Sequence, residues 1–202
     1  MLYRLAKILK WLLRPIFMWV KCDDKSPLNR QGAFIVCCNH VHALDPLSVA
    51  DICPRKISFM AKQELFRNRL IAWFLTRLNA FPVDRQGSDI GAIKTALRRI
   101  KDGWALGIFP EGTRAKTDEM LPFHSGAALL ALRTNVPVIP CAIDKHYRLF
   151  FVRIYMKVGQ PMDFSDLLQN GKPGQEEYDI ATERIRQEIY RLRDLAREER
   201  KR

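Results

Sequence analysis

The sequence predicts an α/β fold with a mainly parallel central sheet of about six or seven strands, flanked by helices, and with an amphipathic helix at the N-terminus. Short apolar runs alternate with segments of helical periodicity along most of the chain, which is typical of a parallel sheet covered on both faces. Clusters of polar residues directly follow several of the apolar runs. No linker rich in Pro, Gly and Ser divides the 202 residues.

We expect an N-terminal amphipathic, membrane-associating helix over residues 1–25 and one globular domain over residues 26–202. Four basic residues recur every three or four positions in the apolar N-terminal stretch: Arg4, Lys7, Lys10 and Arg14. A charge at the centre of a membrane span costs about 2.5–3.5 kcal/mol, whereas a basic residue near anionic lipid gains about 1 kcal/mol. A helix lying in the membrane interface is therefore favoured; the alternative is an ordinary amphipathic helix packed on the domain.

The composition indicates an anionic partner and a reducing environment. Lys and Arg number 34 against 22 Asp and Glu, which gives a net charge of +12. Such a surplus suits nucleic acid, an anionic membrane or a phosphorylated substrate. The aromatic residues are not interleaved with basic ones as in a base-stacking platform, so we expect no nucleic acid. Five cysteines without a C-x-x-C spacing predict a cytosolic chain with no cysteine-built zinc site.

Apolar runs place the strands along the chain. The expected strands cover residues 33–38, 56–61, 80–83, 104–109, 136–143 and 150–158. Prolines at positions 137 and 140 suggest that the strand over 136–143 bulges or lies at an edge.

Periodicity and end signals place the helices between them. The expected helices cover residues 46–53, 68–78, 88–103, 126–134 and 178–201. Pro46 suits a first helical turn, while Ser88 and Gly103 serve as the cap and the end of the third helix. The helix over 68–78 carries unusually many apolar side chains for its length.

Residues 39–46 (NHVHALDP) follow the first buried strand, and open α/β sheets place their chemistry at such strand ends. His40 and Asp45 form a compact acid/base pair if the loop turns back, because the carboxylate then orients the imidazole. His40 is the candidate general base. His42 also offers a metal-binding interpretation together with Asp45, but no further cluster completes a site, so we expect no metal.

Residues 109–114 (FPEGTR) follow another apolar strand and suggest an anion cradle. Gly112 allows close backbone approach, Thr113 can donate a hydrogen bond, and Arg114 can hold a phosphate with two parallel bonds. Glu111 would repel a phosphate, so we expect it to hold Arg114 or a substrate hydroxyl. The alternative is a strand-ending turn with a surface ion pair.

Arg85 follows the short strand over 80–83. In a parallel sheet the carboxyl ends of neighbouring strands share an edge, which would bring Arg85, His40 and Arg114 together. Alone, an arginine after a strand is weak support for a site.

This combination resembles the PlsC-type glycerophospholipid acyltransferases. The H-x-x-x-x-D spacing of His40 and Asp45, Arg85 after its strand, FPEGTR at 109–114 and VPVIP at 136–140 occur in that family's order and approximate spacing. The resemblance covers residues from about 33 to 158. One departure is FHSG at 123–126, where many relatives read F-K-x-G, which puts one basic contact in doubt.

The resemblance implies transfer of a fatty acyl group from acyl-CoA or acyl carrier protein to the sn-2 hydroxyl of 1-acylglycerol 3-phosphate, giving phosphatidate without a cofactor. It implies that His40 is the base and that Asp45 orients it. It further implies an acceptor site in which two arginines hold the phosphate and three residues shape the pocket: Arg85, Arg114, Glu111, Gly112 and Thr113. We expect the protein to lie on the cytoplasmic side of the cell membrane, as a peripheral or monotopic protein bound to an anionic surface.

Two alternatives stay open. The same chemistry can serve another acceptor, such as glycerol 3-phosphate or another lysolipid, because the motifs fix the reaction type better than the acceptor. The chain can also be a basic, non-catalytic module that binds membranes or nucleic acid, although such a module does not require His40 and Asp45. Acyl chain length and the choice of donor are not predicted.

Overall fold

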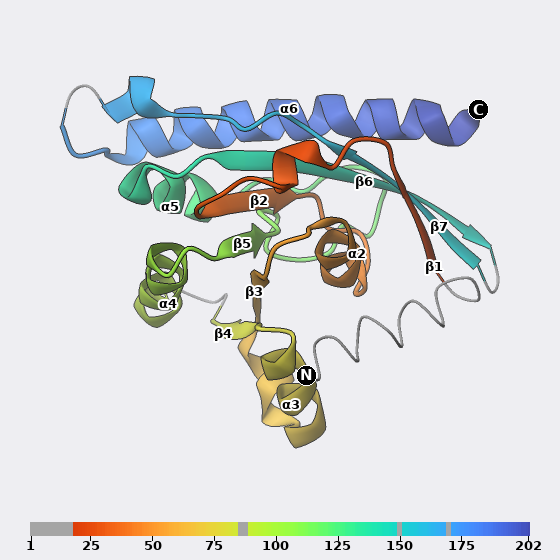
Figure 1. The fold of residues 1–202 in the computed structure, drawn as a ribbon, viewed down its shortest axis with the longest axis horizontal. Helices are drawn as coiled ribbons and strands as arrows, with labels where there is room; N and C mark the ends of the chain where they lie inside the picture. Colours follow the sequence, from red (N-terminus) through yellow and green to blue (C-terminus); the bar gives the residue numbers. More distant parts are fainter. Residues whose placement is uncertain (1–17, 85–88, 149–150, 169–170) are drawn as a thin grey trace.

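The computed structural model describes residues 18–84, 89–148, 151–168 and 171–202 (Figure 1). Its strands are β1 (Met18–Cys22), β2 (Phe34–Cys38), β3 (Ile57–Lys62), β4 (Phe81–Val83), β5 (Ala105–Ile108), β6 (Val138–Arg148) and β7 (Phe151–Val158). Its α-helices are α2 (Asp45–Ile52), α3 (Arg69–Arg77), α4 (Ile90–Lys101), α5 (Gly126–Thr134) and α6 (Gln175–Lys201). Three short 3-10 helices are η1 (Ser26–Leu28), η2 (Gln63–Arg67) and η3 (Ser165–Leu168).

The seven strands form one sheet in the order β1-β7-β6-β2-β5-β3-β4. Every neighbouring pair is parallel except the antiparallel β6–β7 hairpin. The carboxyl ends of β2, β5, β3 and β4 consequently meet at one edge of the sheet. The predicted α/β class with a mainly parallel sheet is confirmed.

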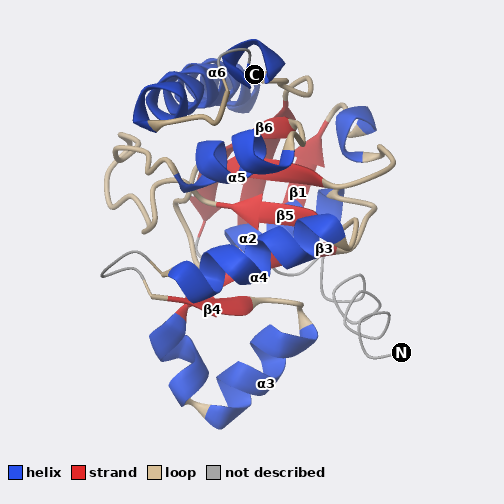
Figure 2. Cartoon of the chain, turned by 90° about the vertical axis from the view of Figure 1, so that its left-hand side faces the viewer, coloured by secondary structure: helices blue, strands red, loops and turns tan. Residues whose placement is uncertain are grey.

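Helices cover both faces of this sheet, and each face has its own core. Side chains of α4, α5 and α6 pack with one set of alternating strand residues, among them Ile35, Leu106 and Val138. The opposite set, which includes Phe34 and Val36, packs with α2 and the segment around Leu28. Figure 2 shows α4 and α5 in front of the strands, with α6 and α3 at opposite ends of the molecule.

The prediction of a helix over residues 1–25 is wrong for residues 18–22. Met18–Cys22 is an edge strand that pairs in parallel with β7, from Met18 with Val152 to Cys22 with Met156. Val20 is buried while its neighbours Trp19 and Lys21 are exposed, which is the alternation of a strand. The globular domain therefore begins before residue 26. Residues 1–17 lie outside the described residues.

The strand expected over 136–143 does not lie at an edge, because β6 runs between β7 and β2. Pro140 is tolerated because the register of β6 with its neighbour changes at this point. Cys141 pairs with Val158, but Val138 bridges Met162, so three residue steps along β6 lie opposite four along the segment after β7. The Pro140 carbonyl still accepts a hydrogen bond from Gly159 N at 2.8 Å. The extra residue of the bulge therefore lies in the segment after β7 and not in β6, where it was predicted.

The cap predicted for α4 also differs by one residue. Asp89 is the N-cap, and its Oδ1 accepts a hydrogen bond from Ala92 N at 2.8 Å. Its Oδ2 accepts from Asp84 N, so this side chain joins the end of β4 to the start of α4. Gly103, with φ of +77°, ends the helix as expected. In the described part of the chain, no helix is long and apolar enough to cross a membrane.

Candidate active site

The backbone after β2 is aligned by a side chain that continues the sheet. Asn39 is buried, its Nδ2 donates to Ile143 O at 3.0 Å, and its Oδ1 accepts from Ile143 N at 2.7 Å. The carboxamide thus replaces one further pair of backbone groups between β2 and β6. This contact, which holds the residue before His40, was missed by sequence reasoning because the two residues are 104 positions apart.

His40 and Asp45 do form the predicted pair. His40 Nδ1 lies 3.0 Å from Asp45 Oδ2, and the same oxygen accepts hydrogen bonds from the backbone N–H groups of Val41 and His42, both at 2.7 Å. Asp45 is fully buried at the first turn of α2, where the helix dipole favours a carboxylate. With Nδ1 directed at Asp45, the other ring nitrogen, Nε2, is the one left for proton transfer.

Glu111 braces the His40 loop instead of holding Arg114. Its Oε1 accepts a hydrogen bond from His40 N at 2.6 Å, and its Oε2 accepts one from Leu121 N at 2.8 Å. The side chain is buried. Burial raises the pKa of the Glu111 carboxyl, while the two backbone hydrogen bonds act in the opposite direction. The expectation of a Glu111–Arg114 pair or a substrate hydroxyl is replaced by a structural role for this carboxylate.

An aromatic stack fixes the plane of the imidazole. The His40 ring lies on Phe109, with centroids 4.3 Å apart and planes 28° apart, and Phe109 in turn stacks on Phe59 at 6.1 Å. These contacts join β3 to the segments that follow β2 and β5. Sequence reasoning placed Phe109 in the FPEGTR segment without a role, and nothing local in the sequence indicated Phe59.

Gly112 and the FHSG segment lie against each other. Gly112 has φ of +67°, a conformation that favours glycine, and a Cβ at this position would meet the His124 ring at 3.0 Å. His124 N also donates to Pro110 O at 2.8 Å. The histidine that stands at the expected lysine position is therefore next to the predicted cradle.

Of the two arginines of the predicted phosphate site, the structure describes Arg114 but not Arg85. Thr113 and Arg114 are exposed, and Ala115 N donates to His40 O at 2.8 Å, so the segment carrying Arg114 runs alongside the His40 loop. Arg85 lies outside the described residues. The structure thus brings His40, Asp45 and the 109–115 segment together and leaves Arg85 a prediction.

The other interpretations of nearby residues find no geometric support. His42 Nδ1 accepts a hydrogen bond from Leu44 N at 3.2 Å. Over the described ranges, no three His, Cys, Asp or Glu side chains group as metal ligands. Complete burial raises the pKa of the Cys37 thiol to about 12, so this residue is not an activated nucleophile.

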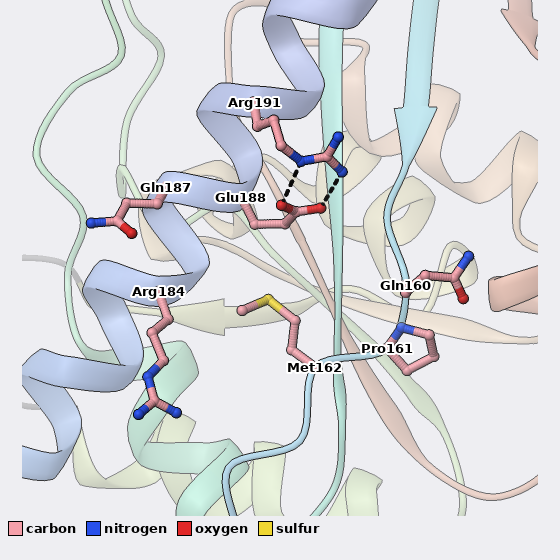
Figure 3. Close-up of a pocket in the computed structure, with 7 residues that line it drawn as sticks. All are labelled: Gln160, Pro161, Met162, Arg184, Gln187, Glu188 and Arg191. Atoms are coloured by element: carbon pink, nitrogen blue, oxygen red, sulfur yellow. Dashed lines mark hydrogen bonds and ion pairs between the residues drawn. The ribbon is translucent and has the colours of Figure 1, made fainter.

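A cavity of about 550 Å³ lies elsewhere, between α6 and the loop after β7 (Figure 3). Arg191 and Glu188 form a bidentate ion pair in its wall, with Nε–Oε2 and Nη2–Oε1 distances of 2.8 and 2.6 Å. None of the predicted site residues lines this cavity: its walls are Gln160, Pro161, Met162, Arg184, Gln187, Glu188 and Arg191.

Comparisons with known proteins agree with this architecture. A family model described as Acyltransferase matches residues 19–144. The chain is 34% identical over 178 residues to the 1-acyl-sn-glycerol-3-phosphate acyltransferase of Bacillus subtilis strain 168, covering 86% of this chain and 87% of that protein. It is 33% identical over 175 residues to the Streptococcus pneumoniae protein of the same name, covering 84% of this chain and 63% of that protein.

A solved structure shares the fold. The crystal structure of the 1-acyl-sn-glycerophosphate (LPA) acyltransferase PlsC from Thermotoga maritima superposes with a TM-score of 0.69 at 24% identity, covering 95% of this chain and 79% of that one. The family match spans both the His40–Asp45 loop and the 109–114 segment. The chain therefore belongs to the acyltransferase family and is an acyltransferase of the 1-acyl-sn-glycerol-3-phosphate acyltransferase, or PlsC, type.

Proposed function

We propose that the chain moves a fatty acyl group from an acyl thioester, either acyl-CoA or acyl-ACP, to the sn-2 hydroxyl of 1-acylglycerol 3-phosphate, giving phosphatidate. The observation that carries the proposal is the His40–Asp45 pair at the carboxyl edge of the sheet, braced by Glu111. The names of the Bacillus and Streptococcus relatives support this acceptor.

In this proposal His40 is the general base. Nδ1 keeps its proton and donates a hydrogen bond to Asp45, so Nε2 can take the proton of the acceptor hydroxyl while that oxygen attacks the thioester carbonyl carbon. An ester C–O bond forms, the C–S bond breaks, and the departing thiolate takes the proton back from Nε2. No acyl-enzyme and no cofactor are needed. Holding the two substrates together supplies several kcal/mol of the barrier reduction.

We assign the acceptor phosphate to Arg114 and Arg85, with Gly112 and Thr113 shaping the pocket. The Ala115–His40 hydrogen bond supports the place of Arg114, because it fixes the neighbouring residue beside the base. Glu111 acts here by positioning the His40 backbone. We also place the enzyme on the cytoplasmic side of the cell membrane as a peripheral or monotopic protein, with its N-terminal residues on the anionic surface.

A donor-by-acceptor assay tests the proposal. The purified full-length chain is incubated with acyl-CoA or acyl-ACP and with lysophosphatidate, glycerol 3-phosphate or lysophosphatidylcholine, and products are identified by mass spectrometry. We expect phosphatidate from lysophosphatidate with at least one donor and no comparable product from the other acceptors. Preferential acylation of either other acceptor would reject the proposed acceptor, and no product with any pair would reject the catalytic assignment.

A further inference from the structure

The η2–α3 segment, Gln63–Arg77, presents an apolar face that touches no core. α3 has no buried residue, and Leu70 is 80% exposed. The exposed large hydrophobic side chains of this segment are Leu65, Leu70, Ile71, Trp73 and Phe74. The helix is nevertheless well formed, because Asn68 Oδ1 accepts hydrogen bonds from the N–H groups of Leu70 and Ile71. A patch of this kind marks a binding surface.

The charges around this face fit an anionic bilayer. From Lys62 to Arg77 the sequence holds four basic residues and one acidic residue, Glu64, which pairs with Lys62 at 3.0 Å. The remaining three, Arg67, Arg69 and Arg77, are exposed. Arg77 lies over the Trp73 ring at 5.0 Å, which joins a cation to an interfacial aromatic side chain. Exposed apolar and aromatic residues flanked by arginines are typical of helices in the membrane interface.

The position of the segment relates this face to the chemistry. η2 begins directly after β3, and β3 pairs in parallel with β5, which pairs in parallel with β2. The segment therefore leaves the sheet at the same edge at which β2 delivers His40. In Figure 1, α3 lies below β4, on the side of the molecule opposite α6. A lipid substrate held in the bilayer under α3 would be on the side of the molecule that carries the site.

We infer that the η2–α3 segment is a membrane-docking surface, separate from the N-terminal residues, that lies on an anionic bilayer and orients the carboxyl edge of the sheet toward the lipid acceptor. The inference rests on the proposed function, since it takes the acceptor to be a lipid. Its occupant is the bilayer surface: Leu70, Trp73 and Phe74 enter the acyl boundary, and the three exposed arginines contact the headgroups.

Flotation with vesicles tests the surface without measuring activity. The full-length chain and its Leu70→Ser/Trp73→Ser variant are compared on vesicles of phosphatidylglycerol and phosphatidylcholine. The matched control is Ile180→Ser/Leu195→Ser, because these two exposed side chains lie on α6, away from α3. We expect at least a tenfold lower partition coefficient for the α3 variant and less than a twofold change for the control. Equal binding by the α3 variant and wild type overturns the inference.

Trp73 itself reports where α3 lies. In a full-length variant with Trp11, Trp19 and Trp104 replaced by Phe, Trp73 is the sole tryptophan. On anionic vesicles containing brominated lipid, we expect its emission to shift to the blue and to be quenched. Unchanged emission from floated protein overturns the inference. A second result would also overturn it. If wild type forms a dimer without lipid in sedimentation analysis and the Leu70→Ser/Trp73→Ser variant does not, a second copy of the chain occupies this face.

The choice of acceptor separates this inference from the proposed function. On lysophosphatidate embedded in vesicles, we expect the α3 variant to lose at least tenfold in rate, and on a short-chain, water-soluble lysophosphatidate to stay within threefold of wild type. Equal losses on both acceptors overturn the docking role. If wild type itself acylates neither acceptor, the proposed function fails, while flotation and Trp73 emission still decide the docking surface.

Discussion

At the scale of single residues, the candidate site is an imidazole held from several directions. Asp45 fixes Nδ1, Phe109 fixes the ring plane, and Glu111 and Ala115 fix the backbone on either side of His40. Such support limits the reorganisation that a proton transfer requires. Asp45 is in this account a positioning residue, because its oxygen acts through the imidazole and two backbone amides.

We expect Asp45→Asn to lower kcat by about 10²–10⁴-fold with little change in the acceptor KM, because the amide no longer selects the tautomer with a free Nε2. Steady-state kinetics on purified protein measures this effect, and thermal unfolding checks the fold. His42→Ala is the control, since this histidine lies in the same loop and its Nδ1 accepts a hydrogen bond from Leu44 N. A kcat within threefold of wild type for Asp45→Asn would contradict the positioning role.

We expect Arg114→Ala to raise the acceptor KM by roughly 10-fold or more and to leave the donor KM nearly unchanged, because a charge-assisted hydrogen bond contributes about 1.5–3 kcal/mol. Lys116→Ala is the matched control, since Lys116 is an exposed cation of the same loop. Separate titrations of donor and acceptor distinguish the two constants. A larger effect on the donor KM would place the acceptor phosphate elsewhere.

At the scale of elements, β3 and β5 support the site through a close contact. Gly107 of β5 has no side chain, and a Cβ there would overlap the Phe59 ring of β3. The absence of a side chain at Gly107 leaves room for the Phe59 ring. Because Phe59 stacks on Phe109 and Phe109 stacks on His40, the position of β3 then determines where the imidazole lies.

Gly107→Ala should therefore destabilise the protein by about 1–3 kcal/mol and lower kcat, because the Phe59 ring has to leave its place in a packed core. Gly126→Ala is the control: Gly126 is the first residue of α5 and has open space around its Cα. There we expect no loss, or a gain of up to about 1 kcal/mol. Urea unfolding measures both variants, and equal stability of the two would show that Phe59 is free to move.

Local patterns predicted most elements because each carries its own signal. Apolar runs marked β2, β3, β5 and β7 to within one or two residues, and Gly126–Thr134 was predicted at both bounds. β1 was predicted as helix because it directly follows a leucine- and lysine-rich helical pattern. Its strand conformation is decided by pairing with β7, more than 120 residues later, and no local window contains that information.

At the scale of the whole molecule, the parallel sheet accounts for what could be predicted of the site. Strand ends on one edge bring the His40 loop and the 109–115 segment together, as the motif order indicated. The partners inside the site could not be predicted in the same way. Glu111 was expected to hold Arg114 or a substrate hydroxyl, but the buried carboxylate accepts hydrogen bonds from two backbone N–H groups instead.

The net charge of +12 predicts a salt-dependent membrane interaction. Because the Debye length shortens from about 10 Å at 0.1 M salt to 3 Å at 1 M, we expect binding to anionic vesicles to fall at least fivefold over that range. Neutral phosphatidylcholine vesicles are the control and should bind weakly at both salt concentrations. Equal, salt-independent binding to both vesicle types would indicate that apolar insertion alone holds the protein.

The central claim is that His40 is the base of an acyl transfer that needs no acyl-enzyme. The most direct measurement is the turnover of purified His40→Ala with the acyl thioester and lysophosphatidate that wild type uses. We expect a loss of about 10²–10⁴-fold or more in kcat, with a melting temperature close to that of wild type, because His40 lies on a loop and belongs to neither of the two hydrophobic core clusters. Near-normal turnover by a folded His40→Ala protein would contradict the account.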